Sequence, residues 1–392
     1  MNEQLVVKNF GPIKDATVDF KRVTVFIGPT GGGKSTLAKL LSVFKSQELF
    51  PGQKKAEIKS LFKDYSIDNY FAKGSSLLFV DKDKNIDTIT SRLLVKRTNS
   101  PLAIERLNSF RAKRDLLAKE TKSMDDTIRN IQHLDHAAFQ KAIYQIWMNM
   151  QGPLVYYIPA ERIFISALEY SWAGLIRDDI GLSKQVLNFA NTFSLARKEV
   201  PELGISFLNV KYIHRNGQDF IKIYESETLF RLYETASGIQ SVTPLLVLLE
   251  HLSCNTEQAQ SFIIEEPELN LYPTAQQGLL NWLVEKCTKG ENDLTITTHS
   301  PYILSHLNLM LYAYQVAEKH PDQKAAIAAI VPEASWINPK EFACYQVEGG
   351  GVHSLVDAEL GLIDNNALDN ISGDKADAFD QLININRGFA HA

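Results

Sequence analysis

One stretch of the sequence has the residue types and the spacing of a phosphate-binding loop. Residues 28–36 fill every fixed position of the pattern G-x-x-x-x-G-K-[ST]. Glycines let the backbone N–H groups turn inward around an anion, and the helix that follows points its positive dipole end at the same place. Lys34 is expected to reach the β- and γ-phosphates, and Ser35 to ligate magnesium, so the pattern predicts a nucleoside triphosphate and Mg²⁺ as ligands. The predicted nucleotide-binding residues are Gly28, Pro29, Thr30, Gly31, Gly32, Gly33, Lys34, Ser35 and Thr36.

Two adjacent carboxylates follow an apolar run and could complete such a site. Residues 262–264 are Phe-Ile-Ile, and Glu265 and Glu266 come directly after them. At the end of a parallel strand neighbouring side chains diverge, so we assign Glu265 to the magnesium shell, through a water, and Glu266 to the general base that orients the attacking water. In isolation the pair would equally suit a solvated acidic turn; behind a complete phosphate loop the metal and base roles are favoured.

A histidine follows another strand-like run and begins a helix. Residues 294–298 lead to His299, after which Ser300 can cap a helix whose first residue is Pro301. A single histidine is often structural, but this one would reach the same sheet edge as the two glutamates. We therefore assign His299 a catalytic contact with the γ-phosphate or the attacking water.

A weaker candidate lies at the start of an apolar helix, where Ser237, Gly238 and Gln240 occur. A helix N-terminus presents free N–H groups and a positive dipole end to a phosphate. Alone this is a common helix cap. Together with the other three elements it predicts residues that complete the nucleotide pocket of a second subunit.

The elements that must position these residues alternate between strands and helices. Strand-like runs occur at residues 5–7, 16–20, 23–27, 154–158, 261–264 and 294–297, and helix-like patterns at 239–252, 274–286 and from 302 onward. Such alternation predicts an α/β fold with a mainly parallel sheet covered on both faces. Hairpin signals occur at residues 80–86 and around the turn Asn216-Gly217. We expect residues 1–50 and 153–392 to form a discontinuous core, and the charged residues 51–152 to form an inserted, mostly helical lobe with an arm at 102–150.

Composition limits the class of protein. The chain has 392 residues, 45% of them hydrophobic, and no run near the roughly 20 apolar residues of a membrane span. Its first four residues lack the layout of a signal peptide, so we expect a cytoplasmic protein without a membrane partner. Three scattered cysteines argue against a disulfide framework or a zinc site.

Charge is unevenly distributed around the overall net value of −5. Residues 92–122 carry nine basic and three acidic side chains, a local net charge of +6. Runs of this kind are usually solvated helix faces, but the stretch from Arg92 to Lys122 leaves DNA open as a partner.

In this order, the four elements resemble the ATP-binding-cassette (ABC) type of ATPase, and within it the branch that contains SMC-like, RecF-like and OLD-family proteins. The matching segments are residues 28–36 as Walker A, 237–240 as the signature motif, 263–266 as Walker B and 298–301 as the switch-histidine region. Residues 157–162 and 265–273 also resemble that branch, and residues 7–14 resemble its first strand and turn, which lies near the base. Two positions depart from the wider pattern, because Ile239 replaces the second signature glycine and Glu265 the Walker B aspartate.

The resemblance implies a P-loop NTPase with an ABC-ATPase-like head that forms a homodimer on ATP, each Walker A facing the partner's signature motif. The residues after His299 show no acidic trio with the spacing of a Toprim nuclease. The implied function is an ATPase of bacterial anti-phage defence, which regulates a protein effector, a nuclease or toxin encoded nearby. A DNA-binding repair or chromosome-maintenance ATPase is the alternative. The altered signature and the polar lobe disfavour a transporter ATPase.

Overall fold

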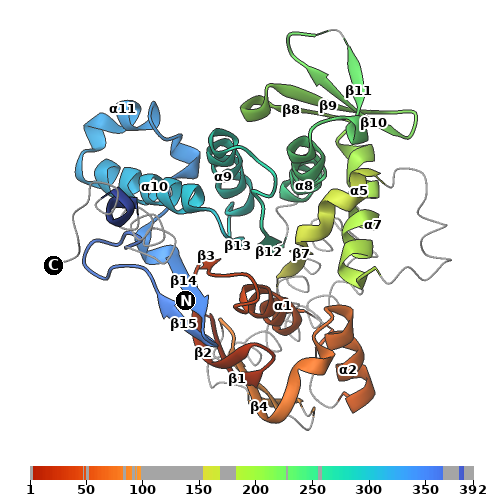
Figure 1. The fold of residues 1–392 in the computed structure, drawn as a ribbon, viewed down its shortest axis with the longest axis vertical. Helices are drawn as coiled ribbons and strands as arrows, with labels where there is room; N and C mark the ends of the chain where they lie inside the picture. Colours follow the sequence, from red (N-terminus) through yellow and green to blue (C-terminus); the bar gives the residue numbers. More distant parts are fainter. Residues whose placement is uncertain are drawn as a thin grey trace, which may run out of the picture.

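The computed structural model describes residues 3–46, 48–49, 53–82, 85–90, 93, 95–98, 153–167, 182–226, 228–254, 258–364 and 379–383. Within them, the chain forms three sheets and two hydrophobic cores, with helices between and around the sheets (Figure 1). The expected α/β architecture of a P-loop NTPase is confirmed.

The central sheet has six strands in the order β15-β14-β3-β13-β12-β7. Its strands are β3 (Val23–Ile27), β7 (Leu154–Ile158), β12 (Gln260–Glu265), β13 (Asp293–Thr298), β14 (Phe342–Glu348) and β15 (Gly351–Ser354). All neighbours run parallel except β15, which is antiparallel to β14. Every residue of β3, β12 and β13 is buried, as expected for strands covered on both faces.

The register of this sheet brings three strand ends together. Ile27 pairs with Thr298, and Glu265 pairs with Thr297. The loops that leave β3, β12 and β13 therefore begin at one edge of the sheet, which is where the sequence analysis expects a site.

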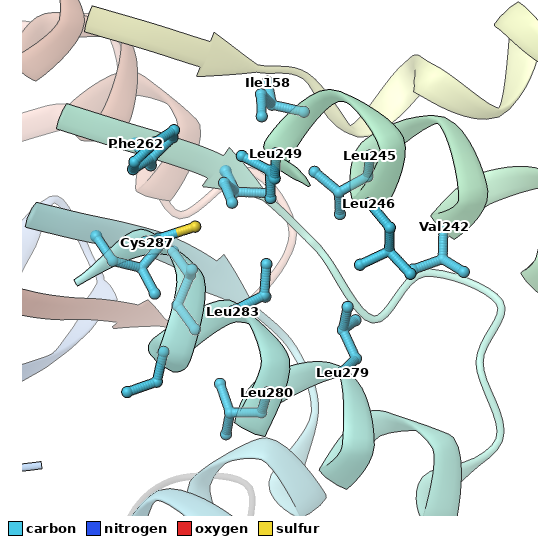
Figure 2. Close-up of a cluster of buried hydrophobic side chains, with 14 of the residues drawn as sticks. Ile158, Val242, Leu245, Leu246, Leu249, Phe262, Leu279, Leu280, Leu283 and Cys287 are labelled. Atoms are coloured by element: carbon cyan, nitrogen blue, oxygen red, sulfur yellow. The ribbon is translucent and has the colours of Figure 1, made fainter. Parts of the chain in front are cut away.

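Helices lie on both faces of the central sheet and beyond them. They are α1 (Lys34–Lys45), α2 (Lys55–Asp64), α5 (Phe164–Ala167), α7 (Lys184–Glu199), α8 (Ser237–Ser253), α9 (Pro273–Cys287), α10 (Pro301–Lys319) and α11 (Lys324–Ala328). On one face, leucines of α8 and α9 form one hydrophobic core with Phe262 of β12 (Figure 2). The opposite face of the sheet packs on α1. There, Ile263 of β12 and Phe26 of β3 belong to the second core, together with Leu37 and Leu41 of α1.

An antiparallel sheet closes the α1 side, in the order β2-β1-β4-β5-β6. Its strands are β1 (Glu3–Phe10), β2 (Ile13–Phe20), β4 (Phe71–Val80), β5 (Ile86–Thr90) and β6 (Val95–Thr98). Because β4 pairs with β1, the strands β4, β5 and β6 extend a sheet that the N-terminus begins, and the expectation of a mostly helical lobe does not hold for these strands. Alternating apolar residues of β4 contribute to the core around α1, which joins these strands to the core domain. The arm expected at 102–150 lies outside the described residues.

A third, four-stranded sheet has the order β11-β10-β9-β8, with β8 (Glu202–Ile205), β9 (Val210–Arg215), β10 (Gln218–Ile223) and β11 (Leu229–Arg231). Both expected hairpins are confirmed, at β4-β5 and at β9-β10. Strands β14 and β15 were not expected, although β14 is an apolar run between Pro339 and Gly349. Among the described residues, no helix combines the length and the apolar character needed to cross a bilayer.

Candidate active site

The phosphate-binding loop connects β3 to α1, and its glycines leave room for backbone that comes from elsewhere in the chain. Gly28 and Gly33 have φ values of 142° and 112°, which residues other than glycine rarely adopt. A Cβ atom at Gly28 would lie 2.3 Å from the carbonyl oxygen of Val347, and one at Gly32 would lie 2.6 Å from the same oxygen. A Cβ atom at Gly33 would lie 2.4 Å from Cδ1 of Ile13. The loop therefore fits between β14 and the β1-β2 turn only because these positions are glycine.

Lys34 is the first residue of α1 and is 5% exposed. Its ammonium donates hydrogen bonds to the carbonyl oxygens of Gly28 at 2.8 Å and of Pro29 at 3.1 Å. Burial lowers the pKa of Lys34, and the negative charges of nearby glutamates, Glu266 foremost, act against that effect. The loop's own carbonyls thus hold the positive charge beside the cradle.

His299 lies between Lys34 and Glu266. Its Nε2 is 3.0 Å from Nζ of Lys34 and 3.0 Å from Oε1 of Glu266. A ring nitrogen accepts a hydrogen bond when it carries no proton and donates one when it does, so Nε2 can bond to only one of these neighbours at a time. The side chains of His299 and Glu266 are 34% and 28% exposed, so both can reach a ligand at this edge.

The loop after β12 is held in place by a buried arginine. Glu266 has φ of 42°, in the left-handed region, and its N–H donates to the carbonyl oxygen of Thr297 at 3.0 Å. Arg162 lies in the 3₁₀ helix η2 (Ala160–Ile163) and is fully buried. Its guanidinium donates to four carbonyl oxygens, those of Pro159 (3.2 Å), Glu265 (2.7 Å), Glu266 (2.6 Å) and Pro267 (3.0 Å). Burial lowers the pKa of Arg162 to about 10, and the guanidinium still carries its charge at neutral pH.

Glu265 has the surroundings of a ligand for a hard cation. Its carboxylate is 5% exposed, and Oε1 has no hydrogen-bond partner among the described residues. Burial raises the pKa of Glu265, while a hydrogen bond from the Ser35 side chain lowers it. Within the described part of the chain, no three His, Cys, Asp or Glu side chains form a set that could hold a metal alone. One buried carboxylate and one hydroxyl instead fit Mg²⁺, which takes few protein ligands and completes its shell with phosphate oxygens and water.

A third carboxylate, Glu268, connects the loops that follow β12 and β13. Its Oε1 accepts hydrogen bonds from Oγ1 of Thr298 and from the backbone N–H of His299, the latter at 3.2 Å. Glu268 is 7% exposed, and burial raises its pKa while the bond from Thr298 opposes that rise. The side chain therefore fixes the backbone that carries His299.

The residues expected to act on a second subunit lie at the start of α8. Ser237 is its first residue and is exposed. Gly238 is buried, and a Cβ atom there would lie 2.6 Å from the carbonyl oxygen of Asn270 in the loop after β12. The side chain of Gln240 donates to the carbonyl oxygens of Tyr233 (2.9 Å) and Thr235 (2.7 Å). Gln240 thus braces the turn before the helix, and of this set Ser237 is the side chain available to a partner.

The structure brings Lys34, His299 and Glu266 into contact and places Ser35 beside Glu265. Sequence reasoning assigned no role to Arg162 or Glu268, although both lie in segments that resemble the family. Those segments and a place near a strand end were the signals for them, but their roles left no local pattern, because both bond to backbone from distant parts of the chain.

Comparisons with known proteins give the following matches. A family model described as an AAA ATPase domain matches residues 1–166 and 182–304. One similar solved structure is the Smc head domain from Pyrococcus furiosus, which has an extended coiled coil and is bound to the C-terminal domain of ScpA. It is 13% identical to this chain, the match covers 90% of this chain and 96% of that one, and the TM-score is 0.39. Another is the SMC head domain from Thermotoga maritima, at 12% identity, 90% and 97% coverage and a TM-score of 0.37. Likeness at this level assigns no activity. No curated protein matches the sequence.

Proposed function

The chain belongs to the AAA ATPase domain family, and we propose that it binds ATP with Mg²⁺ and hydrolyses it at the edge where β3, β12 and β13 end. The observation that carries this proposal is the contact of Lys34, His299 and Glu266 beside the glycine loop, with 3.0 Å between Nε2 of His299 and each neighbour. A lysine at a phosphate cradle and a carboxylate that can orient the attacking water are groups that enzymes of phosphoryl transfer use.

Each side chain then has a distinct task. Glu266 orients the water that attacks the γ-phosphorus and accepts a proton from it. Its carboxylate is partly exposed, and Arg162 holds the backbone that carries it. Lys34 leaves the loop carbonyls to bind the β- and γ-phosphates, and His299 contacts the γ-phosphate or the water. Ser35 and Glu265 hold Mg²⁺, Glu265 through a water; when bound, the ion neutralises charge on the phosphates.

The base and ribose would lie along the β1-β2 turn. Gly11 donates its N–H to the carbonyl oxygen of Tyr70 at 3.0 Å, and Ile13 packs against Gly33 of the loop. An open cavity of about 500 Å³ adjoins this turn, lined in part by Asn9, Lys14 and Tyr70. Its position next to the phosphate loop supports this part of the proposal.

We further propose that ATP joins two copies of the chain, with the exposed Ser237 of each copy completing the partner's site. Its place at a helix N-terminus supports this role. Nucleotide-driven dimerisation would switch a protein effector, a nuclease or toxin, in bacterial anti-phage defence. The alternative is an SMC- or RecF-like repair ATPase that contacts DNA through residues 92–122, nearly all of which lie outside the described residues. Binding to duplex DNA that weakens as salt rises would favour that alternative.

The central test measures ATP hydrolysis and molar mass on one set of proteins. Wild type should hydrolyse ATP only with Mg²⁺. Glu266→Gln should bind ATP, cease hydrolysis and accumulate as a dimer in light scattering, and Ser237→Arg should bind ATP but stay monomeric. Lys34→Ala should bind no nucleotide. If Lys34→Ala hydrolyses ATP and dimerises as wild type does, the proposed function is wrong.

A further inference from the structure

Tyr157 of β7 is buried under the carboxylate that the proposed function assigns to magnesium. In the parallel pairing of β7 with β12, Tyr157 lies opposite Ile263. Glu265 is two residues beyond Ile263, so its side chain and that of Tyr157 leave the same face of the sheet. That face packs on α1, the helix that begins with the phosphate loop.

The two side chains share one face of the sheet, and each has a buried polar atom to satisfy, although Ser35 also bonds to the Glu265 carboxylate. Among the described residues, the Tyr157 hydroxyl and Oε1 of Glu265 are both buried, and neither atom has a hydrogen-bond partner. The groups are nonetheless close enough for each to shift the pKa of the other. A tyrosine hydroxyl carries its proton at neutral pH, so it is the donor of this pair and the carboxylate oxygen is the acceptor. A buried donor and a buried acceptor left unpaired are both costly, so a small rotation that joins them is favourable.

The ring that carries this hydroxyl is held on its other side. Tyr65 packs edge-on against Tyr157, with 5.5 Å between ring centroids, and the Tyr65 hydroxyl bonds to Oγ of Ser42 in α1 at 2.7 Å. Tyr157 is 8% exposed. The ring therefore has little freedom to turn its hydroxyl away from Glu265.

From this geometry we propose that Tyr157 is a positioning residue, whose hydroxyl orients the Glu265 carboxylate toward the magnesium shell. The inference rests on the proposed ATPase function. Tyr157 does not touch nucleotide or water; it directs which lone pairs of Glu265 are offered to the metal shell, as outer hydrogen bonds do around other metal ligands.

The test substitutes Tyr157→Phe, which removes one oxygen and keeps the ring. The matched control is Tyr156→Phe, because that side chain leaves the opposite face of β7 and stacks on Phe262, with 5.7 Å between centroids. Tyr157→Phe should raise the Mg²⁺ concentration for half-maximal hydrolysis by about tenfold, the loss expected for one hydrogen bond to a charged group. Its rate at saturating Mg²⁺ should change far less.

A second readout does not depend on turnover. Affinity for ATP in EDTA should be the same in wild type and both variants, whereas Mn²⁺ bound with ATP, followed by electron paramagnetic resonance, should weaken only in Tyr157→Phe. An unchanged metal requirement in Tyr157→Phe, or an equal change in Tyr156→Phe, overturns the inference. A wild type that neither binds nor hydrolyses ATP refutes the proposed function instead.

Should Tyr157→Phe fold poorly, the hydroxyl can be changed without removing it. Incorporation of 3-fluorotyrosine at position 157 makes the hydroxyl a stronger donor and should lower the Mg²⁺ requirement. A requirement that stays the same or rises also overturns the inference.

Discussion

The buried guanidinium of Arg162 should govern both the stability of the site and its rate. Arg162→Met keeps much of the side-chain volume and removes the donors to four carbonyl oxygens, those of Pro159, Glu265, Glu266 and Pro267. An unsatisfied buried carbonyl costs at least about 1 kcal/mol, so we expect the free energy of unfolding to fall by about 4 kcal/mol. That is a large share of the 5–15 kcal/mol typical of folded proteins, yet it leaves the variant folded.

Activity should fall more than stability alone explains. Glu266 has φ of 42°, and Arg162 holds both its carbonyl and those of the residues on either side. Without the clamp the carboxylate is free to shift, and a displacement near 1 Å can reduce a rate by about 100-fold. We expect kcat for ATP to fall by that order, with ATP affinity nearly unchanged because the phosphate loop is intact.

Urea unfolding and steady-state ATP hydrolysis together test this reasoning. Arg197→Met is the matched control. Arg197 is a largely buried arginine of α7, and its guanidinium donates to Asp219 at 2.9 Å. It should also lose stability but keep the wild-type kcat. If Arg162→Met unfolds at the wild-type urea concentration, the four hydrogen bonds of Arg162 do not stabilise the fold. If it hydrolyses ATP at the wild-type rate, they do not position Glu266.

Three further outcomes are expected. Gly33→Ala forces a Cβ atom to 2.4 Å from Cδ1 of Ile13 at φ of 112°, so mant-ATP fluorescence should show loss of binding and the melting temperature should fall. Retained binding would contradict the strain argument. Lys45 is buried against Asp293 at 2.9 Å, and Lys45→Met should lower the free energy of unfolding by about 3–5 kcal/mol. Burial lowers the pKa of Lys45, but its carboxylate neighbours raise the pKa more, so the net shift is upward. This stabilisation should therefore be full below pH 10.5 and lost only as the pH rises through the higher pKa of the folded state. A loss of stability already at neutral pH would contradict an upward shift. Of the three cysteines, only Cys254 is exposed, and burial raises the pKa of the other two thiols, so a thiol reagent should label one cysteine quickly and two only on unfolding.

Much of the central sheet could be predicted because its elements depend on local pattern. Apolar runs before Gly28, Glu265 and His299 indicated buried strands, and their parallel order brought all three loops to one edge. Of the antiparallel strands after residue 70, only the β4-β5 hairpin was indicated by the sequence. The pairing of β4 with β1 and the strand β6 were missed, because a charged segment with polar turns resembles a solvated helix when its pairing partner is unknown. That partner, β1, precedes β4 by more than sixty residues.

The sequence by itself determined the phosphate loop, the paired carboxylates, the histidine and the kind of sheet that carries them, because each depends on residues adjacent in the chain. Only the tertiary structure decided how they are held. The carbonyl of Val347 explains two of the glycines, and Arg162 reaches the carbonyl of Glu265 across 103 residues. Tyr157 and Glu265 share one face of the sheet through the register of two strands. Contacts of this kind follow from packing between distant segments, and no periodicity within either segment records them.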